Sequence, residues 1–460
     1  MNIFSLIREQ AQAQPGQLAY RQAGTPDAGL TYRDLVTASE AFAERLQGAG
    51  CQPGERCGLW GPDGPEFLVS ALGILAAGLC IVPLGTFLPP AEVNLVVGAA
   101  GLQHLYAIPP GRLRTFPPPS AVDGEDDTRF RSLNPAYIRF TSGTTGSRKG
   151  VLLSHESMEK RISAADEALQ IGPGDQVWFQ LPMADHFVVS VLLYLTRGAT
   201  VVSAPGHEPA TWLQLIRACR PTIIYGSPAF YRQLAESSVG PLPGLRLAIS
   251  TTSHLPHKVQ RRFQERFGRP LNAALGIIEV GLLTLDRSAS HPGSVGTVLP
   301  AYQATMVGPD GLPAPRGELG ELHVNGPGLL DAYLAPWRPR AKLLGKFGFP
   351  TGDFGRLDAA NNLYLAGRGH SRVEVDAFVF FAEEVEAVLN AFPEIHDSRV
   401  YLDPRSGLLT AEVVPEPGAT LPQRLEPTLF LDPRLAPAVV TEVTALPRTP
   451  NGKLRRDGMV

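Results

Sequence analysis

The sequence predicts an α/β protein, with a large N-terminal domain of αβαβα-type subdomains plus a β-rich subdomain, and a small mobile α+β C-terminal domain. A chain of 460 residues is too long for one simple core. Short apolar runs alternate with helical patterns through most of it, which is typical of helices packed on a largely parallel sheet. From about Gly293 the strands become shorter, and another unit begins near Gly369. We therefore expect domains at 1–368 and 369–460.

The first expected element is an amphipathic helix in MNIFSLIREQAQAQPG, with Ile3, Phe4, Leu6 and Ile7 as its apolar residues. This segment lacks the basic start and the long apolar stretch of a signal peptide. We predict a helix docked on the core of a cytoplasmic protein.

The next notable segment, 67–88, is apolar and long enough to span a bilayer. Three glycines and one proline interrupt it. We therefore predict a buried helix to about Ala77, followed by a buried strand in CIVPL, and no membrane association.

Further apolar runs predict strands, and longer periodic segments predict helices. Strands are expected at 56–60, 136–140, 177–181, 200–204, 222–226 and 245–250, and helices at 154–169 and 256–268. In the last unit, 372–380 is strand-like, 382–392 is helical, and 399–404, 408–415 and 438–446 predict further strands.

Composition excludes several classes of function. The formal net charge of −3, with no basic excess, argues against a nucleic-acid partner. The four cysteines lack the CxxC spacing of a zinc or redox site, so we expect buried free thiols in a reducing cytosol.

The most polar loop is FTSGTTGSRKG, at 140–150. Its glycines allow the backbone N–H groups to turn inward and form a concave nest for anionic oxygens, while hydroxyls and Lys149 add donors and charge. The loop differs from the P-loop, which needs GxxxxGK[ST]. The pattern favours a phosphate-holding loop, and the alternative is a flexible surface linker.

Three further sites support the phosphate-holding interpretation. TGDFGR places Asp353 where its carboxylate would accept hydrogen bonds from a ribose diol, and AGR adds Arg368. The terminal PRTPNGK forbids regular structure and presents Lys453 at the tip of a loop.

These motifs, in this order, resemble those of the adenylate-forming superfamily of acyl- and aryl-CoA synthetases, nonribosomal peptide synthetase adenylation domains and beetle luciferases. The resemblance implies that ATP and Mg²⁺ are bound, that Lys453, Glu279 and Lys149 are catalytic, and that Thr141 and Glu279 hold the metal. The residues implied for ATP binding are Thr141, Ser142, Gly143, Thr144, Thr145, Gly146, Thr252, Asp353 and Arg368.

In the implied reaction a carboxylate attacks the α-phosphorus of ATP. Both reactants are negatively charged, so the site has to offset the repulsion between them. Lys149 and the loop would hold the β- and γ-phosphates, and Lys453 would lie between the acid's carboxylate and the α-phosphate. In the superfamily the small domain then rotates about a hinge, here Ser371, so that a thiol attacks the adenylate.

The sequence departs from the superfamily at several positions. Leu275-Gly276-Ile277-Ile278-Glu279 replaces aromatic-Gly-x-Thr-Glu, and Thr251-Thr252-Ser253 replaces a Gly-Gly-Ala type motif. Ser371 replaces Asp or Lys, and Ala377 replaces a glycine beside the pantetheine path. These losses predict a slow enzyme. The alternative, from a different class of function, is a degenerate scaffold that binds a nucleotide without catalysis.

The segment LPMADHF resembles the pocket motif of aryl-acid-activating members, with Asp185 in the usual His position and His186 next to it. His186 disfavours an amino acid, and its alternative role is a local hydrogen bond. We expect an aryl or unsaturated aryl acid, with a fatty acid as the alternative. The positions implied to line the pocket are His186, Tyr225, Ser227, Ser250, Leu275, Gly276 and Gly281.

The expected activity is that of an ATP-dependent acid:thiol ligase. The expected acceptor is the phosphopantetheine thiol of a carrier protein, because no basic cluster is placed to bind the nucleotide end of coenzyme A. A fatty acyl ligase for coenzyme A or an acyl carrier protein is the competing enzyme hypothesis.

Overall fold

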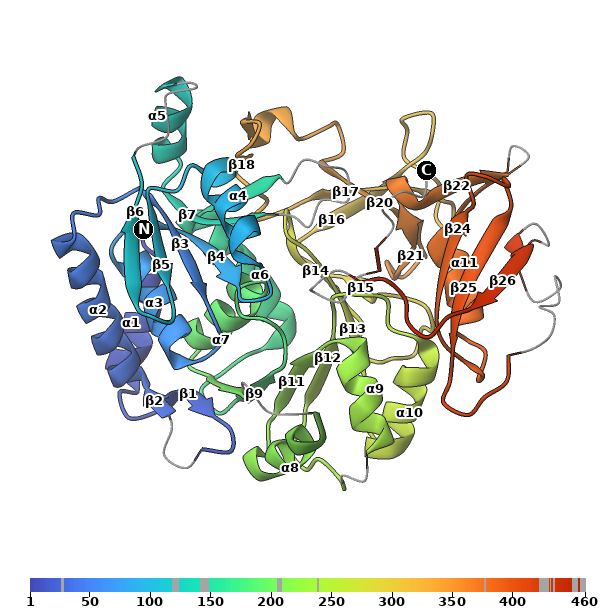
Figure 1. Cartoon of the computed structure of the whole chain (residues 1–460), viewed down its shortest axis with the longest axis horizontal. Helices are drawn as coiled ribbons and strands as arrows, with labels where there is room; N and C mark the ends of the chain where they lie inside the picture. Colours follow the sequence, from blue (N-terminus) through green and yellow to red (C-terminus); the bar gives the residue numbers. More distant parts are fainter. Residues whose placement is uncertain are drawn as a thin grey trace.

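The computed structural model describes residues 1–25, 29–117, 124–140, 149–204, 209–237, 240–375, 378–421, 430, 432, 435–448 and 454–455. Within them the chain forms two large mixed sheets covered by helices, a smaller antiparallel sheet and a small C-terminal unit (Figure 1). The predicted α/β architecture of a large domain and a small domain is confirmed. The boundary at 368/369 remains a prediction.

The first sheet has a parallel centre and antiparallel edges. β3 pairs in parallel with β4 and β5, and β4 pairs in parallel with β7. Its order is β19 (Arg338–Pro339), β18 (Ala332–Tyr333), β8 (Gly150–Ser154), β7 (Pro135–Phe140), β4 (Cys80–Gly85), β3 (Arg56–Gly61), β5 (His104–Ala107), β6 (Arg112–Thr115).

The second sheet is parallel from β1 to β13 and ends in an antiparallel hairpin. Its order is β15 (Thr297–Val298), β14 (Gly281–Leu285), β13 (Asn272–Ile277), β12 (Leu247–Ser250), β11 (Ile223–Gly226), β9 (Gln176–Phe179), β10 (Thr200–Ser203), β1 (Leu18–Gln22), β2 (Gly29–Thr31).

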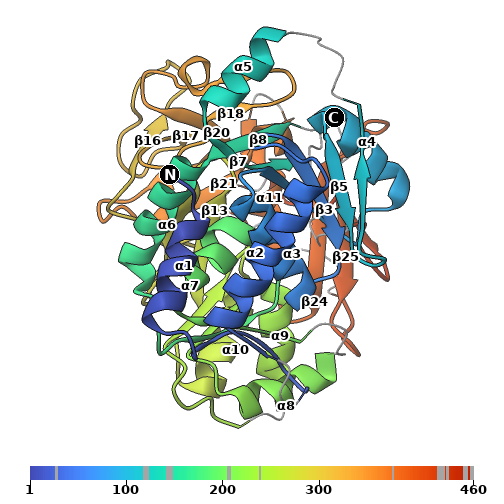
Figure 2. The ribbon, with the colours of Figure 1, turned by 90° about the vertical axis from the view of Figure 1, so that its left-hand side faces the viewer.

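Helices cover these sheets, and Figure 2 shows α1, α2 and α3 side by side. Phe4 and Ile7 of α1 are buried, as the amphipathic pattern predicts. The helices of this domain are α1 (Phe4–Ala13), α2 (Tyr32–Gly48), α3 (Pro65–Ala76), α4 (Pro90–Ala100), α5 (Gly124–Ser132), α6 (His155–Leu169), α7 (Leu193–Thr196), α8 (Pro209–Cys219), α9 (Pro228–Glu236) and α10 (His257–Phe267), with a π-helix η1 (Phe187–Leu192) before α7.

The apolar segment 67–88 divides as predicted into helix α3 and strand β4. Pro65 lies in the first turn of α3, where its missing N–H costs nothing, and Gly78 turns the chain with a φ of 77°. Within the described chain, no helix is long and apolar enough to cross a membrane.

The predicted β-rich part is an antiparallel sheet. Its order is β16 (Gln303–Val307), β17 (Gly320–Asn325), β20 (Phe349–Leu357), β21 (Leu363–Arg368), and the short 3-10 helix η2 (Arg340–Lys342) precedes β20. β21 ends at Arg368, directly before the 3-10 helix η3 (Gly369–Ser371).

The small C-terminal unit contains one correction to the sequence analysis. The strand-like run 372–380 is a hairpin of two antiparallel strands, because β22 and β23 pair Arg372 with Phe381. The elements are β22 (Arg372–Val375), β23 (Phe378–Phe381), α11 (Ala382–Leu389), and the sheet β24 (Ile395–Leu402), β25 (Leu409–Pro415), β26 (Val439–Glu442).

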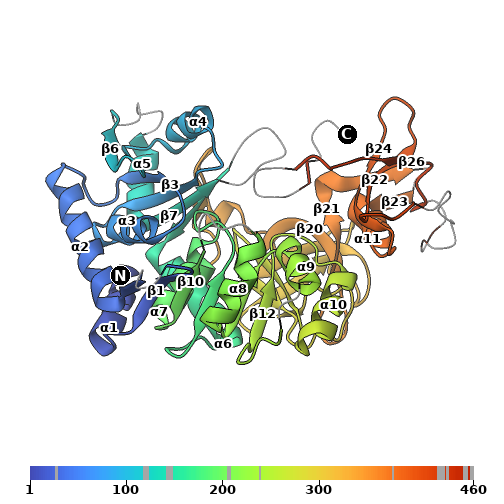
Figure 3. The ribbon, with the colours of Figure 1, turned by 60° about the horizontal axis from the view of Figure 1, so that its bottom comes forward.

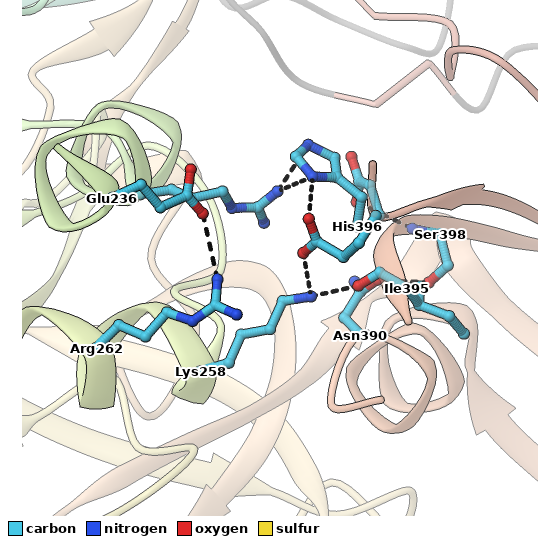
Figure 4. Close-up of polar contacts among 10 residues, drawn as sticks. Glu236, Lys258, Arg262, Asn390, Ile395, His396 and Ser398 are labelled. Atoms are coloured by element: carbon cyan, nitrogen blue, oxygen red, sulfur yellow. Dashed lines mark hydrogen bonds and ion pairs between the residues drawn. The ribbon is translucent and has the colours of Figure 1, made fainter. Parts of the chain in front are cut away.

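The small unit contacts α9 and α10 of the large domain, beside which Figures 1 and 3 place it. A polar cluster joins them (Figure 4). Lys258 Nζ lies 3.0 Å from Glu416 Oε1 and also donates to the carbonyl of Ile395. Arg232 Nη1 lies 2.7 Å from His396 Nε2, and His396 Nδ1 lies 3.2 Å from Glu416 Oε2.

All four cysteines are buried and free, which confirms the prediction of structural thiols. Burial raises the pKa of the Cys51 and Cys219 thiols, so both stay protonated and unreactive at neutral pH.

Candidate active site

Glu279 lies in the turn between β13 and β14, at the end of the second sheet. Tyr333 of β18 donates a hydrogen bond of 2.8 Å from its hydroxyl to Glu279 Oε1. Burial, followed by the charge of Glu279, raises the pKa of the Tyr333 phenol, so this hydroxyl remains a donor. The hydrogen bond holds one carboxylate oxygen of Glu279 in a fixed place.

Lys149 lies beside the same tyrosine. Its ammonium is 5.2 Å from the centre of the Tyr333 ring, because β18 pairs with β8 and sets Tyr333 opposite Val151. The predicted catalytic residues Glu279 and Lys149 are therefore brought together by Tyr333, although 130 positions separate them in the sequence.

A buried arginine fixes the turn that carries Glu279. Arg161 of α6 is 1% exposed and donates from Nη1 to the carbonyl of Ile278 at 2.9 Å. It also donates from Nε to the carbonyl of Gly328 at 2.9 Å, and the N–H of Leu330 donates to the carbonyl of Glu279 at 2.8 Å. The turn is thus held from two sides by groups that leave the carboxylate of Glu279 unblocked.

Asp353 and Arg368 form a second polar site. They are register partners on β20 and β21, and Arg368 Nε donates to Asp353 Oδ1 at 2.8 Å. Asp353 is 3% exposed, whereas the side chain of Arg368 is 53% exposed. The structure therefore brings together the two residues that the motifs assign to the ribose.

Ser371 closes the turn that follows Arg368. Its hydroxyl donates to the carbonyl of Arg368 at 2.8 Å and accepts from the N–H of Arg368 at 3.0 Å. A serine at this position thus ties the proposed hinge to the end of β21.

A third group of residues lies at the carboxyl ends of parallel strands, where α/β sheets bind ligands. The ring of Tyr225 at the end of β11 stacks on Phe179 of β9, with a centroid distance of 5.7 Å and an interplanar angle of 4°. The His186 ring meets Tyr225 edge-on at 5.9 Å, and Tyr194 meets it at 6.4 Å. His186 and Tyr225 are therefore neighbours, as predicted for one pocket.

The other predicted pocket residues lie on adjacent strand ends. Ser250 ends β12, its hydroxyl is buried, and Leu275 and Gly276 are in β13 opposite β14, which begins at Gly281. Ser227 also caps α9, because its hydroxyl accepts from the N–H of Phe230 at 3.3 Å. Its hydroxyl thus has a structural role beside the proposed contact.

Thr252 has a φ of 81°, a left-handed conformation that a β-branched residue rarely adopts. Such strain persists where the surrounding structure imposes it, and it gathers at functional sites. Thr252 lies two residues after the end of β12, beside the predicted pocket.

Several predicted residues lie outside the described part of the chain. These are Lys453, Ala377, and Thr141, Ser142, Gly143, Thr144, Thr145 and Gly146 of the loop. Their roles stay predictions.

Sequence reasoning missed four residues that the structure places at these sites: Tyr333, Arg161, Arg139 and Asp63. Arg139 could have been noticed, because it is the only charged residue in the strand AYIRF. No local signal indicated Tyr333 or Arg161, since their partners are distant in the sequence.

The site fits ATP with Mg²⁺. No group of three or more His, Cys, Asp or Glu side chains that could hold a metal exists in the ranges described above, so no all-protein cage is present there. Mg²⁺ in nucleotide sites is commonly bound by one or two carboxylates together with phosphates and water. The carboxylate of Glu279, with Oε1 held by Tyr333, fits this requirement, and its role as a metal ligand stays a prediction.

Comparisons with known proteins identify the family of this chain. Feruloyl-CoA synthase of Amycolatopsis sp is 28% identical, over 96% of this chain and 95% of its own length. Phenyloxazoline synthase MbtB of Mycobacterium tuberculosis is also 28% identical, over 97% of this chain but only 34% of its own. ATP-bound MatB from Rhodopseudomonas palustris has the same fold, with a TM-score of 0.84 at 24% identity over 99% of this chain and 97% of its own.

The sequence profile described as AMP-binding enzyme matches residues 7–334, which is more than half of the chain. Together with the site around Glu279 and Asp353, this match shows that the chain belongs to the AMP-binding enzyme family and is an adenylate-forming acid ligase.

Proposed function

We propose that this ligase activates an aryl acid as its acyl-adenylate and transfers the acyl group to the phosphopantetheine thiol of a carrier protein. The observation that carries the aryl assignment is the stacked pair of Phe179 and Tyr225, with His186 edge-on, at the carboxyl ends of β9 and β11. Flat aromatic surfaces favour a flat ring by offset or edge-to-face contact.

In the first step, the acid's carboxylate attacks the α-phosphorus of ATP and pyrophosphate leaves. Asp353 and Arg368 would bind the ribose, and Glu279 with Thr141 would hold Mg²⁺, which would neutralise phosphate charge. Lys149 and the loop 141–148 would stabilise the leaving pyrophosphate, and Lys453 would act between the carboxylate and the α-phosphate. Tyr333 keeps Glu279 oriented for this step.

In the second step, the thiol sulfur attacks the acyl carbon, a thioester forms and AMP leaves. Feruloyl-CoA synthase, whose name gives an aryl acid and coenzyme A, supports coenzyme A as the alternative acceptor. The formal net charge of −3 without a basic cluster favours the carrier protein.

Two assays test this proposal. Pyrophosphate release is measured over a panel of aryl, fatty and amino acids, and thioester formation is then measured for the best acid with coenzyme A or with a carrier protein encoded beside the enzyme. We expect aryl acids to lead the panel and the carrier protein to be the better acceptor. A fatty acid at the head of the panel would refute the aryl assignment, and efficient turnover with micromolar coenzyme A alone would refute the carrier assignment.

A further inference from the structure

A half-buried ion pair lies at the carboxyl end of β7, next to the aromatic pocket. Arg139 Nη2 is 3.2 Å from Asp185 Oδ1, and the two side chains are 23% and 16% exposed. Arg139 is the penultimate residue of β7, whereas Asp185 follows β9 and directly precedes His186. The pair therefore joins the ends of strands from both large sheets.

The pair is electrostatically coupled to the aromatic wall. Burial raises the pKa of the Tyr225 phenol to about 12, and the positive charge of Arg139 acts in the opposite direction. His186, which meets this ring edge-on, connects Asp185 to the same wall.

A second carboxylate, that of Asp63, lies near Asp185. The N–H of Met183 donates to Asp63 Oδ1 at 3.0 Å. Burial raises the pKa of Asp63 to about 6, against that hydrogen bond and with a further contribution from the charge of Asp185. Asp63 also lines a cavity of about 290 Å³ with Gly61, Pro62, Gly85, Thr86, Phe87 and Pro182.

Asp185 pairs with the guanidinium of Arg139, whereas Asp63 accepts a hydrogen bond from the N–H of Met183. Asp185 Oδ2 is buried and accepts no hydrogen bond from any residue that the structure describes. Buried carboxylate oxygens without a donor are rare in folded proteins, and those that occur call for a missing partner.

We propose that Asp185 Oδ2 accepts a hydrogen bond from a hydroxyl or amino substituent on the substrate acid, so that the enzyme selects acids that carry such a donor. This inference rests on the proposed function and specifies its substrate class. An acid with a second carboxylate is disfavoured, because it would add negative charge beside Asp63 and Asp185. An unsubstituted or methylated acid would leave the buried oxygen without a partner.

Arg139 is a positioning residue in this scheme. Its contact with Oδ1 orients Asp185 so that Oδ2 is the oxygen left for the substrate. A purely structural ion pair is the alternative, and it predicts no dependence of the acid ranking on either residue.

The test is acid-dependent exchange of pyrophosphate into ATP, which reports adenylation alone. Benzoic and cinnamic acids that carry hydroxyl, amino, methyl, carboxyl or no substituent are compared at each ring position. We expect kcat/KM for the best amino or hydroxyl acid to exceed that of its methyl counterpart by at least ~10-fold, as for sites built to bind a polar group. Equal values for these pairs, or a preference for the carboxyl or methyl acid, would overturn the inference.

Asp185→Asn gives the sharper comparison. With its carbonyl oxygen turned to Arg139, the asparagine presents an N–H donor to the substrate, so the preference for an amino over a methyl substituent should disappear. Asp175→Asn is the matched control, because Asp175 also pairs with an arginine, Arg246, but precedes the amino end of β9. It should lower stability and leave the ranking of acids unchanged.

Failure of this inference is distinguishable from failure of the proposed function. If no acid supports exchange, the proposed function is wrong. If exchange occurs but amino and methyl acids rank equally in the wild type, the function stands and the donor selection is refuted. The wild-type comparison decides even if Asp185→Asn fails to fold.

Discussion

The hydroxyl of Tyr333 donates a 2.8 Å hydrogen bond to Oε1 of Glu279, across two elements that belong to different sheets. The tyrosine thereby orients a carboxylate that the proposed function assigns to Mg²⁺. Residues that orient metal ligands typically contribute about 10- to 100-fold to metal affinity.

Tyr333→Phe should therefore raise the Mg²⁺ concentration needed for half-maximal pyrophosphate exchange by roughly 10-fold, and Glu279→Gln should raise it further. Tyr401→Phe is the matched control, since Tyr401 pairs with Glu412 in the small domain at 3.4 Å. A Mg²⁺ titration of the three variants measures these shifts. If the Mg²⁺ titrations of the wild type and Glu279→Gln superimpose, Glu279 does not bind the metal and has only a structural role.

The pairing of Asp353 with Arg368 predicts that Asp353 contributes to the affinity for ATP and to recognition of the ribose hydroxyls. Asp353→Asn keeps the size of the side chain and removes its charge, and a hydrogen bond to a charged group contributes about 1.5–3 kcal/mol. We expect the KM for ATP to rise about 10- to 100-fold. The variant should also lose its discrimination between ATP and 2′-deoxy-ATP.

Asp358→Asn serves as the control for that experiment, because Asp358 is bonded to Asn362 in the turn after β20. It should leave both the KM for ATP and the deoxy-ATP ratio unchanged. If Asp353→Asn still discriminates against deoxy-ATP as the wild type does, then Asp353 does not bind the ribose.

Asp63 predicts a pH dependence of stability. Burial raises the pKa of its carboxyl to about 6 from an ordinary 3.8, so the folded protein holds this proton more tightly than the unfolded chain does. The resulting stabilisation is fully present below pH 3.8 and is lost as the pH rises through about 6.

Asp63→Asn removes this titration while its carbonyl oxygen still accepts from the N–H of Met183. Between pH 5 and pH 8, the free energy of unfolding of the wild type should fall relative to the variant by about 1 kcal/mol. Urea unfolding at several pH values measures this difference. Parallel pH profiles of unfolding free energy for the two proteins would show that the pKa of Asp63 is not raised in the folded protein.

The polar cluster between the domains predicts how firmly the small domain is held. Lys258 and Glu416 are 10% and 17% exposed, so this pair is shielded more than a surface ion pair. Lys258→Met should therefore weaken the domain contact by ~1 kcal/mol, or about 5-fold. Trypsin cleavage at Arg368 and Arg372, which flank the 3-10 helix η3, should accelerate to a similar extent.

Arg261→Met is the control on the same helix, because the Arg261–Glu265 pair is exposed and remains within α10. It should leave the cleavage rate as in the wild type. Equal rates for the Lys258 and Arg261 variants would mean that the cluster contributes nothing to the domain contact.

Local signals predicted much of the fold. The split of 67–88 into helix and strand followed from glycine and proline, which act through backbone geometry alone. The hairpin at 372–381 escaped prediction because no glycine interrupts this stretch of sequence, which therefore resembles one continuous strand. Sequence pairs such as Asn-Gly or Asp-Gly are the strongest short-range signal of a hairpin.

Sequence motifs could predict which single residues belong to the candidate site, but they could not predict which of these residues are in contact. Asp353 and Arg368 belong to two separate motifs. They lie side by side because β20 pairs with β21, which the motifs do not indicate. The sequence did not indicate Tyr333, because its contact with Glu279 depends on the pairing of β18 with β8. Arg139 is the only charged residue in the strand AYIRF and could have been noticed, but its partner Asp185 comes from the segment that follows β9 of the other sheet.

The most direct test of the account is acid-dependent exchange of pyrophosphate into ATP by the wild type and by Lys453→Ala, with ATP binding measured in parallel. The account predicts exchange with at least one carboxylic acid in the wild type. It also predicts that Lys453→Ala, altered in the small domain, loses exchange while it keeps most of its ATP affinity. ATP binding without exchange for any acid in the wild type would instead identify a nucleotide-binding scaffold and contradict the account.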